Sequence, residues 1–248
     1  MEINVRKPAV AGAFYPADEN ELNKMLREFF DNAPVSDKRV PRAIIVPHAG
    51  YVYSGQVAAL AYKLVKDYEK VVLLGPSHTV YLEDVVSDTH QFWETPLGLV
   101  SIVKNDFEKN EGAHANEHCL EVQVPFLQFV LKKFEILPLV VGEVDVKSVS
   151  EKVQKVLDDK TLLVVSSDLS HYHSYDMAEI LDNETIENIK NLNENESIDA
   201  CGEFPIRILI DIAKKKNWKP KVLGYRNSGD VTGEKFRVVG YTSIAFYA

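Results

Sequence analysis

Three histidines each follow an apolar run that is typical of a buried β-strand. His48 follows "IIVP", His78 follows "LLGPS" and His171 follows "VVSSDLS". If these runs are neighbouring parallel strands, their carboxyl ends meet at one edge of the sheet, where open α/β sheets bind their ligands. Two neutral imidazoles that lie close together can hold Zn, Cu, Fe or Ni. The pattern therefore indicates a metal site at this edge.

A metal held by two histidines needs a third protein ligand, for which the sequence offers Asp168, Glu121, His118 and Cys201. Cys201 comes just before or at the start of the helical pattern "CGEFPIRILI". A helix N-terminus lowers the pKa of a thiol, and the thiolate is the form that binds metal. His118 and Glu121 are three residues apart, so on a helix they would share one face as paired ligands or as a hydrogen-bonded surface pair.

Several other residues are expected to have no part in chemistry. Cys119 lies in an apolar pattern and is expected in the core, while His90 and His173 are expected to be ordinary surface residues. The serines of "PSH" and "SSDLSH" are not in a G-x-S-x-G turn, which argues against a serine hydrolase. The glycines fit neither a dinucleotide fingerprint nor a phosphate-binding loop.

The first half of the chain predicts a parallel crossover. The strand "RAIIVP", a helix "SGQVAALAYKLVKDY" capped by Ser54, and the strand "EKVVLLGPSH" form a strand–helix–strand unit over residues 42–78. Before it, Asp18 is expected to cap the helix "ENELNKMLREFFDN". After it, "NEHCLEVQVPFLQFVLKKF" is expected to be helical for much of its length, with a kink or a boundary at Pro125.

The second half continues the alternation of strands and helices. The strands "EILPLVVG" and "TLLVVSSDLSHYH" flank the helix "DVKSVSEKVQKVLDD", and two more helical patterns precede two C-terminal strands. No repeat or long linker divides the chain. We therefore expect a single domain over residues 1–248, an α/β fold of three layers with helices on both faces of a mostly parallel or mixed sheet.

Composition narrows the classes of function. The chain has 248 residues, a net charge of −9 and a pI near 5.3, and this acidic balance argues against nucleic-acid binding. No apolar stretch is long enough for a membrane span, and the N-terminus has no signal-peptide core. With only two cysteines, the sequence predicts a cytoplasmic protein with free thiols and no membrane partner.

Several segments together resemble one known family. The stretches "PAVAGAFYPAD", "PHAGYVYSG", "LGPSH" and "SSDLSHY", extended by "EHCLEVQVPFLQ" and "CGEFPI", are similar to the Memo family (mediator of cell motility; AmmeMemoRadiSam system protein B-like). The resemblance runs from Pro8 to Tyr247. It implies a three-layer α/β/α domain similar to the class III extradiol ring-cleaving dioxygenases, which are non-heme iron(II) enzymes.

The resemblance also implies a ligand set. In Memo proteins a metal, iron or copper, is held by two histidines and a cysteine, which by motif correspond to His48, His78 and Cys201. Asp168 and His171 of "SSDLSH" belong to the same pocket. The related dioxygenases suggest His171, oriented by Asp168, as acid and base, and they place His118 of the "EH" segment beside the ligands. A cysteine in place of the dioxygenase carboxylate favours Cu(I) or a more electron-rich iron.

These implications define the expected function. The first hypothesis is a redox metalloenzyme, dioxygenase-like, with iron(II) or copper as cofactor and a small aromatic molecule as substrate. The related AmmeMemoRadiSam families suggest a radical-SAM protein as a pathway partner. The alternatives are a non-catalytic module that binds a peptide or small ligand in the old metal pocket, and a copper or iron chaperone. Phosphotyrosine-peptide binding, proposed for an animal member, is not carried over, because Phe14 replaces a tryptophan and no arginine cluster is evident.

Overall fold

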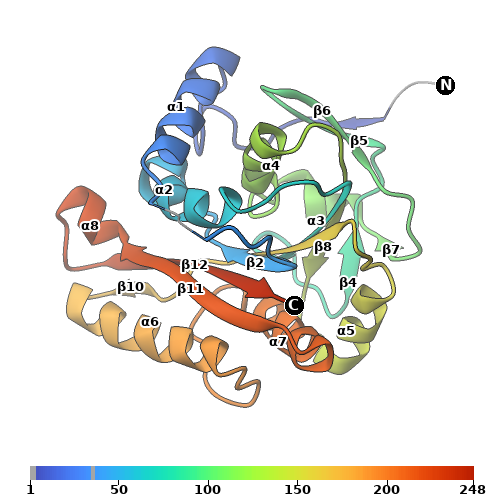
Figure 1. Cartoon of the computed structure of the whole chain (residues 1–248). Helices are drawn as coiled ribbons and strands as arrows, with labels where there is room; N and C mark the ends of the chain where they lie inside the picture. The colour runs from blue at the N-terminus through green and yellow to red at the C-terminus, as the bar shows by residue number, and fades with distance from the viewer. Residues whose placement is uncertain (1–3, 35–36) are drawn as a thin grey trace.

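A mixed sheet of twelve strands forms the middle layer of the protein (Figure 1). The computed structural model describes residues 4–34 and 37–248, and the statements below concern these residues. The strand order along the sheet is β1-β5-β6-β8-β3-β9-β2-β12-β10, with β11 beside β12, and β4 pairs with β7 and β8. This confirms the predicted α/β class with a mixed sheet between helical layers.

Parallel pairing of buried strands forms the centre of the sheet. The strands β8 (Glu135–Val141), β3 (Lys70–Pro76), β9 (Thr161–Ser166) and β2 (Ala43–Val46) run side by side in the same direction. Every residue of β2 and β9 is buried, as expected for a sheet covered on both faces. The three strands that were expected to end near histidines or polar residues, β2, β9 and β3, are thus direct neighbours.

Both flanks of the sheet contain antiparallel pairs. On one side β12 (Val238–Tyr247) runs antiparallel to β2, β11 (Lys219–Asn227) and β10 (His171–His173). On the other side lie five short strands: β1 (Val5–Arg6), β4 (Val85–Ser87), β5 (Phe92–Thr95), β6 (Gly98–Ile102) and β7 (Glu108–Lys109). The short strands β1, β7 and β10 have no alternation long enough to predict, because each spans only two or three residues.

Strand side chains alternate between two hydrophobic cores, one on each face of the sheet. In β2, Ile44 and Val46 belong to one core, while Ala43 and Ile45 belong to the other. The helices that cover the first face are α1 (Glu19–Asp31), α2 (Tyr51–Tyr62) and α4 (Val124–Val130). Those on the second face are α5 (Val146–Gln154), α6 (Tyr175–Lys190) and α7 (Glu203–Lys216). The short helices α3 (Glu111–Ala115) and α8 (Ser228–Thr232) lie in connections.

The predicted cap of α1 is confirmed, and the predicted cap of α2 is wrong. Asp18 caps α1 as expected, since its carboxylate accepts from the backbone N–H groups of Asn20 and Glu21. Ser54 does not cap α2, which begins three residues earlier after Gly50; its hydroxyl donates to the Ala49 carbonyl instead, across 2.9 Å.

The region "NEHCLEVQVPFLQFVLKKF" is not one long helix. A turn leads into a short 3₁₀ helix (Glu121–Gln123), and α4 then begins at Val124. Pro125 sits in the first turn of α4, where its missing N–H would have no helical partner in any case. It therefore marks a boundary and does not kink a helix.

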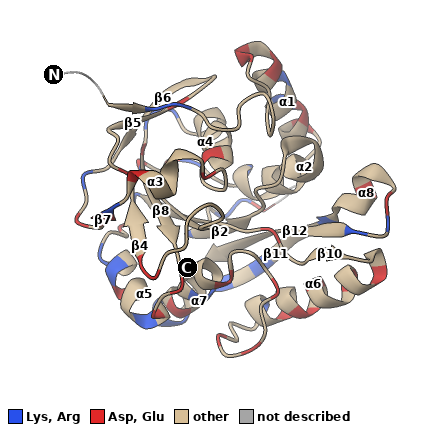
Figure 2. Ribbon diagram, turned by 180° about the vertical axis from the view of Figure 1, so that it is seen from behind, with Lys and Arg blue, Asp and Glu red and all other residues tan. Residues whose placement is uncertain are grey.

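Charged side chains of both signs are spread over the surface (Figure 2). Acidic residues run along α6, while three lysines in the last turn of α7 favourably face the negative end of its dipole. Within the described part of the chain, no helix combines the length and the apolar character that crossing a membrane requires.

A buried carboxylate ties the N-terminal segment to the body of the protein. Glu121 accepts from Arg6 Nη1 at 2.7 Å, from the backbone N–H groups of Ala9 and Val10 at 2.8 and 3.0 Å, and from the Tyr15 hydroxyl at 2.8 Å. The side chains of Arg6 and Glu121 are only 2% and 0% exposed. Glu121 therefore faces away from the cavity described below and is not a metal ligand, and it does not pair with His118 as its spacing suggested.

We expect loss of this carboxylate to destabilise the protein strongly. Glu121→Leu leaves the Arg6 guanidinium buried without its partner, which costs about 3–5 kcal/mol of unfolding free energy. The measurement is urea unfolding followed by circular dichroism. The matched control is Glu94→Gln, which removes the exposed partner of the neighbouring Lys7 and is expected to cost at most about 1 kcal/mol. Equal effects of the two substitutions would contradict the assignment.

Candidate metal centre

A cavity of about 720 Å³ opens at the carboxyl ends of β2, β3 and β9. Its lining includes six of the residues that the sequence singled out, but not Glu121; the six are His48, His78, His118, Asp168, His171 and Cys201. The position agrees with the rule that α/β sheets bind ligands beyond the carboxyl ends of their parallel strands. The fold thus brings together residues that span more than 150 positions of the sequence, from His48 to Cys201. The role of each residue stays a prediction.

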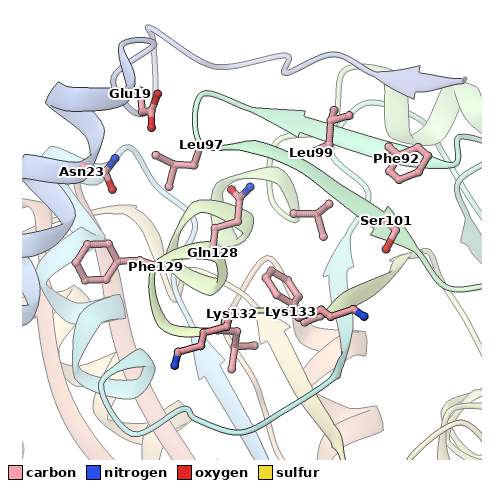
Figure 3. A pocket seen from close by; sticks show the side chains of 13 residues that line it. Glu19, Asn23, Phe92, Leu97, Leu99, Ser101, Gln128, Phe129, Lys132 and Lys133 are labelled. Carbon is pink, nitrogen blue, oxygen red and sulfur yellow. The ribbon is translucent and has the colours of Figure 1, made fainter.

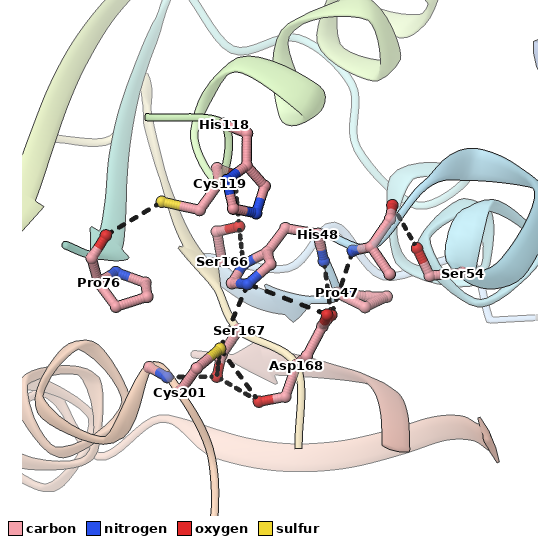
Figure 4. A network of polar contacts seen from close by, with 12 residues as sticks. Pro47, His48, Ser54, Pro76, His118, Cys119, Ser166, Ser167, Asp168 and Cys201 are labelled. Atoms are coloured by element: carbon pink, nitrogen blue, oxygen red, sulfur yellow. Dashed lines mark hydrogen bonds and ion pairs between the residues drawn. The ribbon is translucent and has the colours of Figure 1, made fainter. Parts of the chain in front are cut away.

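The donor atoms of His48, His78 and Cys201 form a compact group. One ligand atom from each lies within 4.8 Å of the others. Cys201 Sγ is 3.2 Å from His48 Nε2 (Figure 4), and the two imidazole centroids are 5.1 Å apart at an interplanar angle of 81°. Bond lengths of about 2.0–2.1 Å to nitrogen and about 2.3 Å to sulfur suit donors at such separations. The residues therefore fit a metal ion.

The proton on the His48 ring can be placed from its hydrogen-bond partners. Gln123 Nε2 donates to the Pro47 carbonyl at 2.9 Å and to Ser166 Oγ at 2.8 Å, while Gln123 Oε1 accepts from the Tyr62 hydroxyl. Ser166 uses its one proton to donate to the Cys119 carbonyl at 2.7 Å. Ser166 Oγ must then accept from His48 Nδ1, which lies 3.0 Å away.

This network leaves Nε2 of His48 without a proton, and its lone pair faces Cys201 Sγ at 3.2 Å. Burial lowers the pKa of His48 well below its usual value, and the neighbouring imidazoles of His78 and His118 lower it further. The ring is therefore neutral, protonated on Nδ1, and ready to donate electrons through Nε2. This is the form in which histidine binds metals, with the other ring nitrogen held by an outer hydrogen bond.

Glu117 holds His78 in a corresponding way. Its carboxylate accepts from the His78 backbone N–H at 2.6 Å and lies 3.0 Å from His78 Nδ1, so Nε2 of His78 is left for a metal. Burial alone would raise the pKa of Glu117, but hydrogen bonds from the ring and backbone of His78 and from the Cys119 backbone lower it to about 2. Glu117 is therefore a full negative charge beneath the site.

Glu117, His78 and His118 also satisfy the distance criteria for a metal group. The carboxylate, however, already accepts from three backbone N–H groups, those of His78, His118 and Cys119, at 2.6, 2.9 and 3.0 Å. It also contacts His78 Nδ1 at 3.0 Å. Its lone pairs are thus used within the protein. We interpret Glu117 as the residue that orients the loop around one metal site, and not as a ligand of a second one.

Cys201 immediately precedes α7, but its thiol is not activated by the helix. Burial raises the pKa of Cys201 to about 12, and the nearby Asp168 carboxylate contributes to the increase. The expectation that the helix N-terminus would lower this pKa is therefore wrong for the protein alone. Desolvation outweighs the dipole because the sulfur is enclosed by Ser167, His48 and the Asp168 carbonyl (Figure 4). A thiol coordinated to a cation is deprotonated nevertheless.

Asp168 and His171 line the same cavity but do not form the expected pair. Asp168 Oδ1 accepts from the backbone N–H groups of His48 and Ala49 at 2.8 and 3.3 Å, and Oδ2 lies 4.0 Å from His48 Nε2. Among the described hydrogen bonds none joins it to His171, so Asp168 orients His48 and its loop instead. Burial raises the pKa of Asp168 to about 7 and lowers the pKa of His171, which keeps the imidazole neutral.

Sequence reasoning missed the three residues that orient the ligands: Glu117, Gln123 and Ser166. Each is fully or almost fully buried although polar, and burial is not visible in a sequence. Ser166 offered the best signal, because it is the polar last residue of an apolar strand.

His90 was expected to be an ordinary surface residue, but its Nδ1 lies 2.7 Å from the buried carboxylate of Asp88. Cys119 is buried as predicted, and both thiols are free.

A second cavity, of about 500 Å³, lies far from these residues between α1, α4 and the β5–β6 hairpin (Figure 3). Its wall combines apolar side chains such as Leu97 and Phe129 with the lysines Lys132 and Lys133. It contains no histidine or cysteine and no cluster of titratable groups comparable with the first cavity. Of these two cavities, the one at the carboxyl ends of β2, β3 and β9 is therefore the candidate functional site.

The fold and the site define a three-layer α/β protein with a His-His-Cys group in a cavity at the carboxyl ends of its parallel strands. Comparison with known proteins gives the family: the model for "Memo-like protein" matches residues 6–245, and the chain belongs to the Memo family. A MEMO1 family protein of Aquifex aeolicus is 40% identical, covering 98% of this chain and 100% of its own length. One from Sulfolobus acidocaldarius is 39% identical over 98% and 99% of the two chains.

A solved structure supports the fold independently of close sequence similarity. The crystal structure of an uncharacterized protein from Escherichia coli K12 matches 85% of this chain and 100% of that chain, with a TM-score of 0.52. The two sequences are only 12% identical, so the similarity concerns the fold alone.

We expect Ser166→Ala to release the His48 ring. Without the hydroxyl oxygen, Nδ1–H loses its acceptor, and the ring can populate both neutral tautomers. Nitrogen NMR of histidine-labelled protein should show the proton on Nδ1 in the wild type and a mixture in the variant, and Co(II) affinity should fall by about 10–100-fold. Ser54→Ala removes another buried hydroxyl, which bonds only to Ala49, and should change neither result. A wild-type proton on Nε2 would refute the derivation.

Proposed function

We propose that this Memo-family protein is a redox metalloprotein that binds iron(II) or copper through His48, His78 and Cys201 and acts on a small aromatic substrate. The observation that carries the proposal is the compact group of donors from these three residues, in which Cys201 Sγ lies 3.2 Å from His48 Nε2. Two imidazoles and a thiolate suit copper or iron, whereas carboxylate-rich sites suit Mg²⁺ or Ca²⁺.

The cavity favours a substrate over a closed storage site. Its walls carry the aromatic side chains of Phe14, Tyr53, Tyr172 and Tyr241, and its volume of about 720 Å³ is in the usual range for small-molecule pockets. The Phe14 ring lies 4.8 Å from the His118 ring, which in turn lies 4.9 Å from the His78 ring. An aromatic molecule could therefore lie against these rings beside the metal ligands. A metal chaperone has no need for such a chamber.

Two residues of the cavity are suited to move protons. Burial brings the pKa of Asp168 to about 7, so its carboxyl group can both accept and donate a proton near neutral pH. His171 is neutral and half-buried in the opposite part of the lining, where it can accept a proton from a phenol. When bound, the metal supplies Lewis-acid and redox chemistry, which no side chain offers. Dioxygenase-like oxidation of an aromatic ring is the specific reaction that we propose.

The cellular setting stays a prediction as well. Two free thiols suit the reducing cytoplasm, which is where we place the protein. A radical-SAM protein remains our proposed pathway partner, and no described feature of the surface identifies where such a partner would dock.

We expect metal binding to depend on the three ligands. Protein purified anaerobically and analysed by mass spectrometry for metals should contain iron or copper, and His48→Ala and Cys201→Ser should lose most of it. The matched control is Cys119→Ala, which removes the other thiol, itself bonded to the Pro76 carbonyl, and should keep its metal. Unchanged metal content in both ligand variants would show that the site is assigned wrongly.

We expect the Fe(II)-loaded protein to consume O₂ with at least one member of a catechol panel. His171→Gln should lower this rate by about 10²–10⁴-fold, the usual contribution of a general acid or base, without loss of metal. His173→Gln alters an exposed neighbour that faces Asp199 across 3.9 Å and serves as the control. Absence of O₂ uptake with every catechol would remove the dioxygenase-like reaction from the proposal.

A further inference from the structure

The cavity contains one side chain with a permanent positive charge. Besides the histidines, Arg237 is the single basic residue in the described lining. A ligand that carries an anion therefore finds one fixed cation on the wall of this chamber.

Arg237 is an exposed residue whose guanidinium contacts an aromatic ring and keeps its donors free. Its Cζ lies 4.9 Å from the centroid of the Tyr172 ring, a cation–π contact. None of the described hydrogen bonds or ion pairs uses this guanidinium. The N–H groups of this guanidinium therefore stay available, in the fork arrangement that matches a carboxylate.

The nearby carboxylate does not neutralise this cation. Glu234 also lines the cavity, but its Oε1 accepts from the backbone N–H of Phe236 at 2.7 Å. It thus closes the turn that leads into β12 and does not form an ion pair with Arg237. Arg237 thus contacts the Tyr172 ring, whereas the Glu234 carboxylate accepts a hydrogen bond from its own loop.

The backbone around Tyr172 gives a second, independent sign of function. Tyr172 has φ of 63°, in the left-handed region that bulky residues rarely adopt, and β10 has a register shift against β12 between His171 and His173. Strained residues and bulges concentrate at functional sites, where they redirect a side chain. Here the bulge puts the Tyr172 ring between His171, at a centroid distance of 5.7 Å, and Arg237.

We propose that Arg237 binds the carboxylate of an aromatic acid, so that the substrate of this cavity is an anionic aromatic compound. The inference rests on the proposed function in one respect, namely that the aromatic ring itself lies toward His48, His78 and Cys201. The carboxylate lies on the wall of His171 and Tyr172, and Tyr172 holds the guanidinium at the correct side of the chamber. A neutral aromatic compound of the same shape cannot form this ion pair with Arg237.

The test compares 3,4-dihydroxybenzoate with 3,4-dihydroxybenzamide, which has the same shape and no charge. Binding is measured by calorimetry, with and without added Fe(II), to wild-type protein, Arg237→Gln, Arg237→Lys and Arg226→Gln. Arg226 is an exposed residue of β11 outside the cavity lining, so it controls for the change in net charge. Catechol binding and metal content are measured in each variant to detect any disturbance of the remaining site.

We expect the wild type to bind the acid about tenfold more tightly than the amide, which is the lower end for a hydrogen bond to a charged group. Arg237→Gln should bring the ratio close to one, Arg237→Lys should retain part of it, and Arg226→Gln should leave it unchanged. An unchanged preference in Arg237→Gln, or no preference or no binding of the acid in the wild type, overturns the proposal. If metal content is lost in the ligand variants as expected but the preference is absent, the metal site stands and only this inference fails.

Discussion

The parallel pairing of β9 with β2 on one side and β3 on the other determines where the loops that carry His48, His78 and Asp168 lie. Val46 is in register with Ser166, so the loop that begins with Pro47 and His48 starts beside the loop that leads to Asp168. The pairing of β3 with β9 brings the turn that carries His78 to the same edge. All three strands are buried on both faces, and therefore a shift of one residue would turn core side chains onto the wrong face.

Beneath this edge, buried polar groups fix the orientation of the His48 and His78 imidazoles through their Nδ1 atoms. Tyr62, Gln123 and Ser166 form one chain of hydrogen bonds that ends on His48, and Glu117 performs the same task for His78. The direction of each hydrogen bond in this chain is fixed by the one before it, so only one placement of the protons satisfies every group. A buried polar network of this kind is costly when one member is missing, and it gives the imidazoles a defined direction.

The sequence indicated the architecture and six residues that line the cavity, but not the buried polar residues that orient them. Long apolar runs such as those of β3 and β9 announce buried parallel strands, and a histidine after such a run can be placed at the edge of the sheet. The spacing of His118 and Glu121 was misleading because the two residues do not share a helix. His118 lies in a loop, Glu121 begins a short 3₁₀ helix, and α4 begins only at Val124, so the two side chains face different ways. The pKa of Cys201 could not be anticipated, since it depends on enclosure by segments far away in sequence.

The buried Arg6–Glu121 pair has a consequence for the order in which the protein folds. The N-terminal segment carries Phe14, which forms part of the cavity wall, but its anchor lies 106 residues beyond Tyr15 and 115 beyond Arg6. Contacts of such long range form late, because a large loop must close before they bring any gain. The segment that carries Arg6 and Tyr15 is thus expected to be among the last to find its place. An early folding intermediate would have the sheet edge in place while the wall beside His118 is still open.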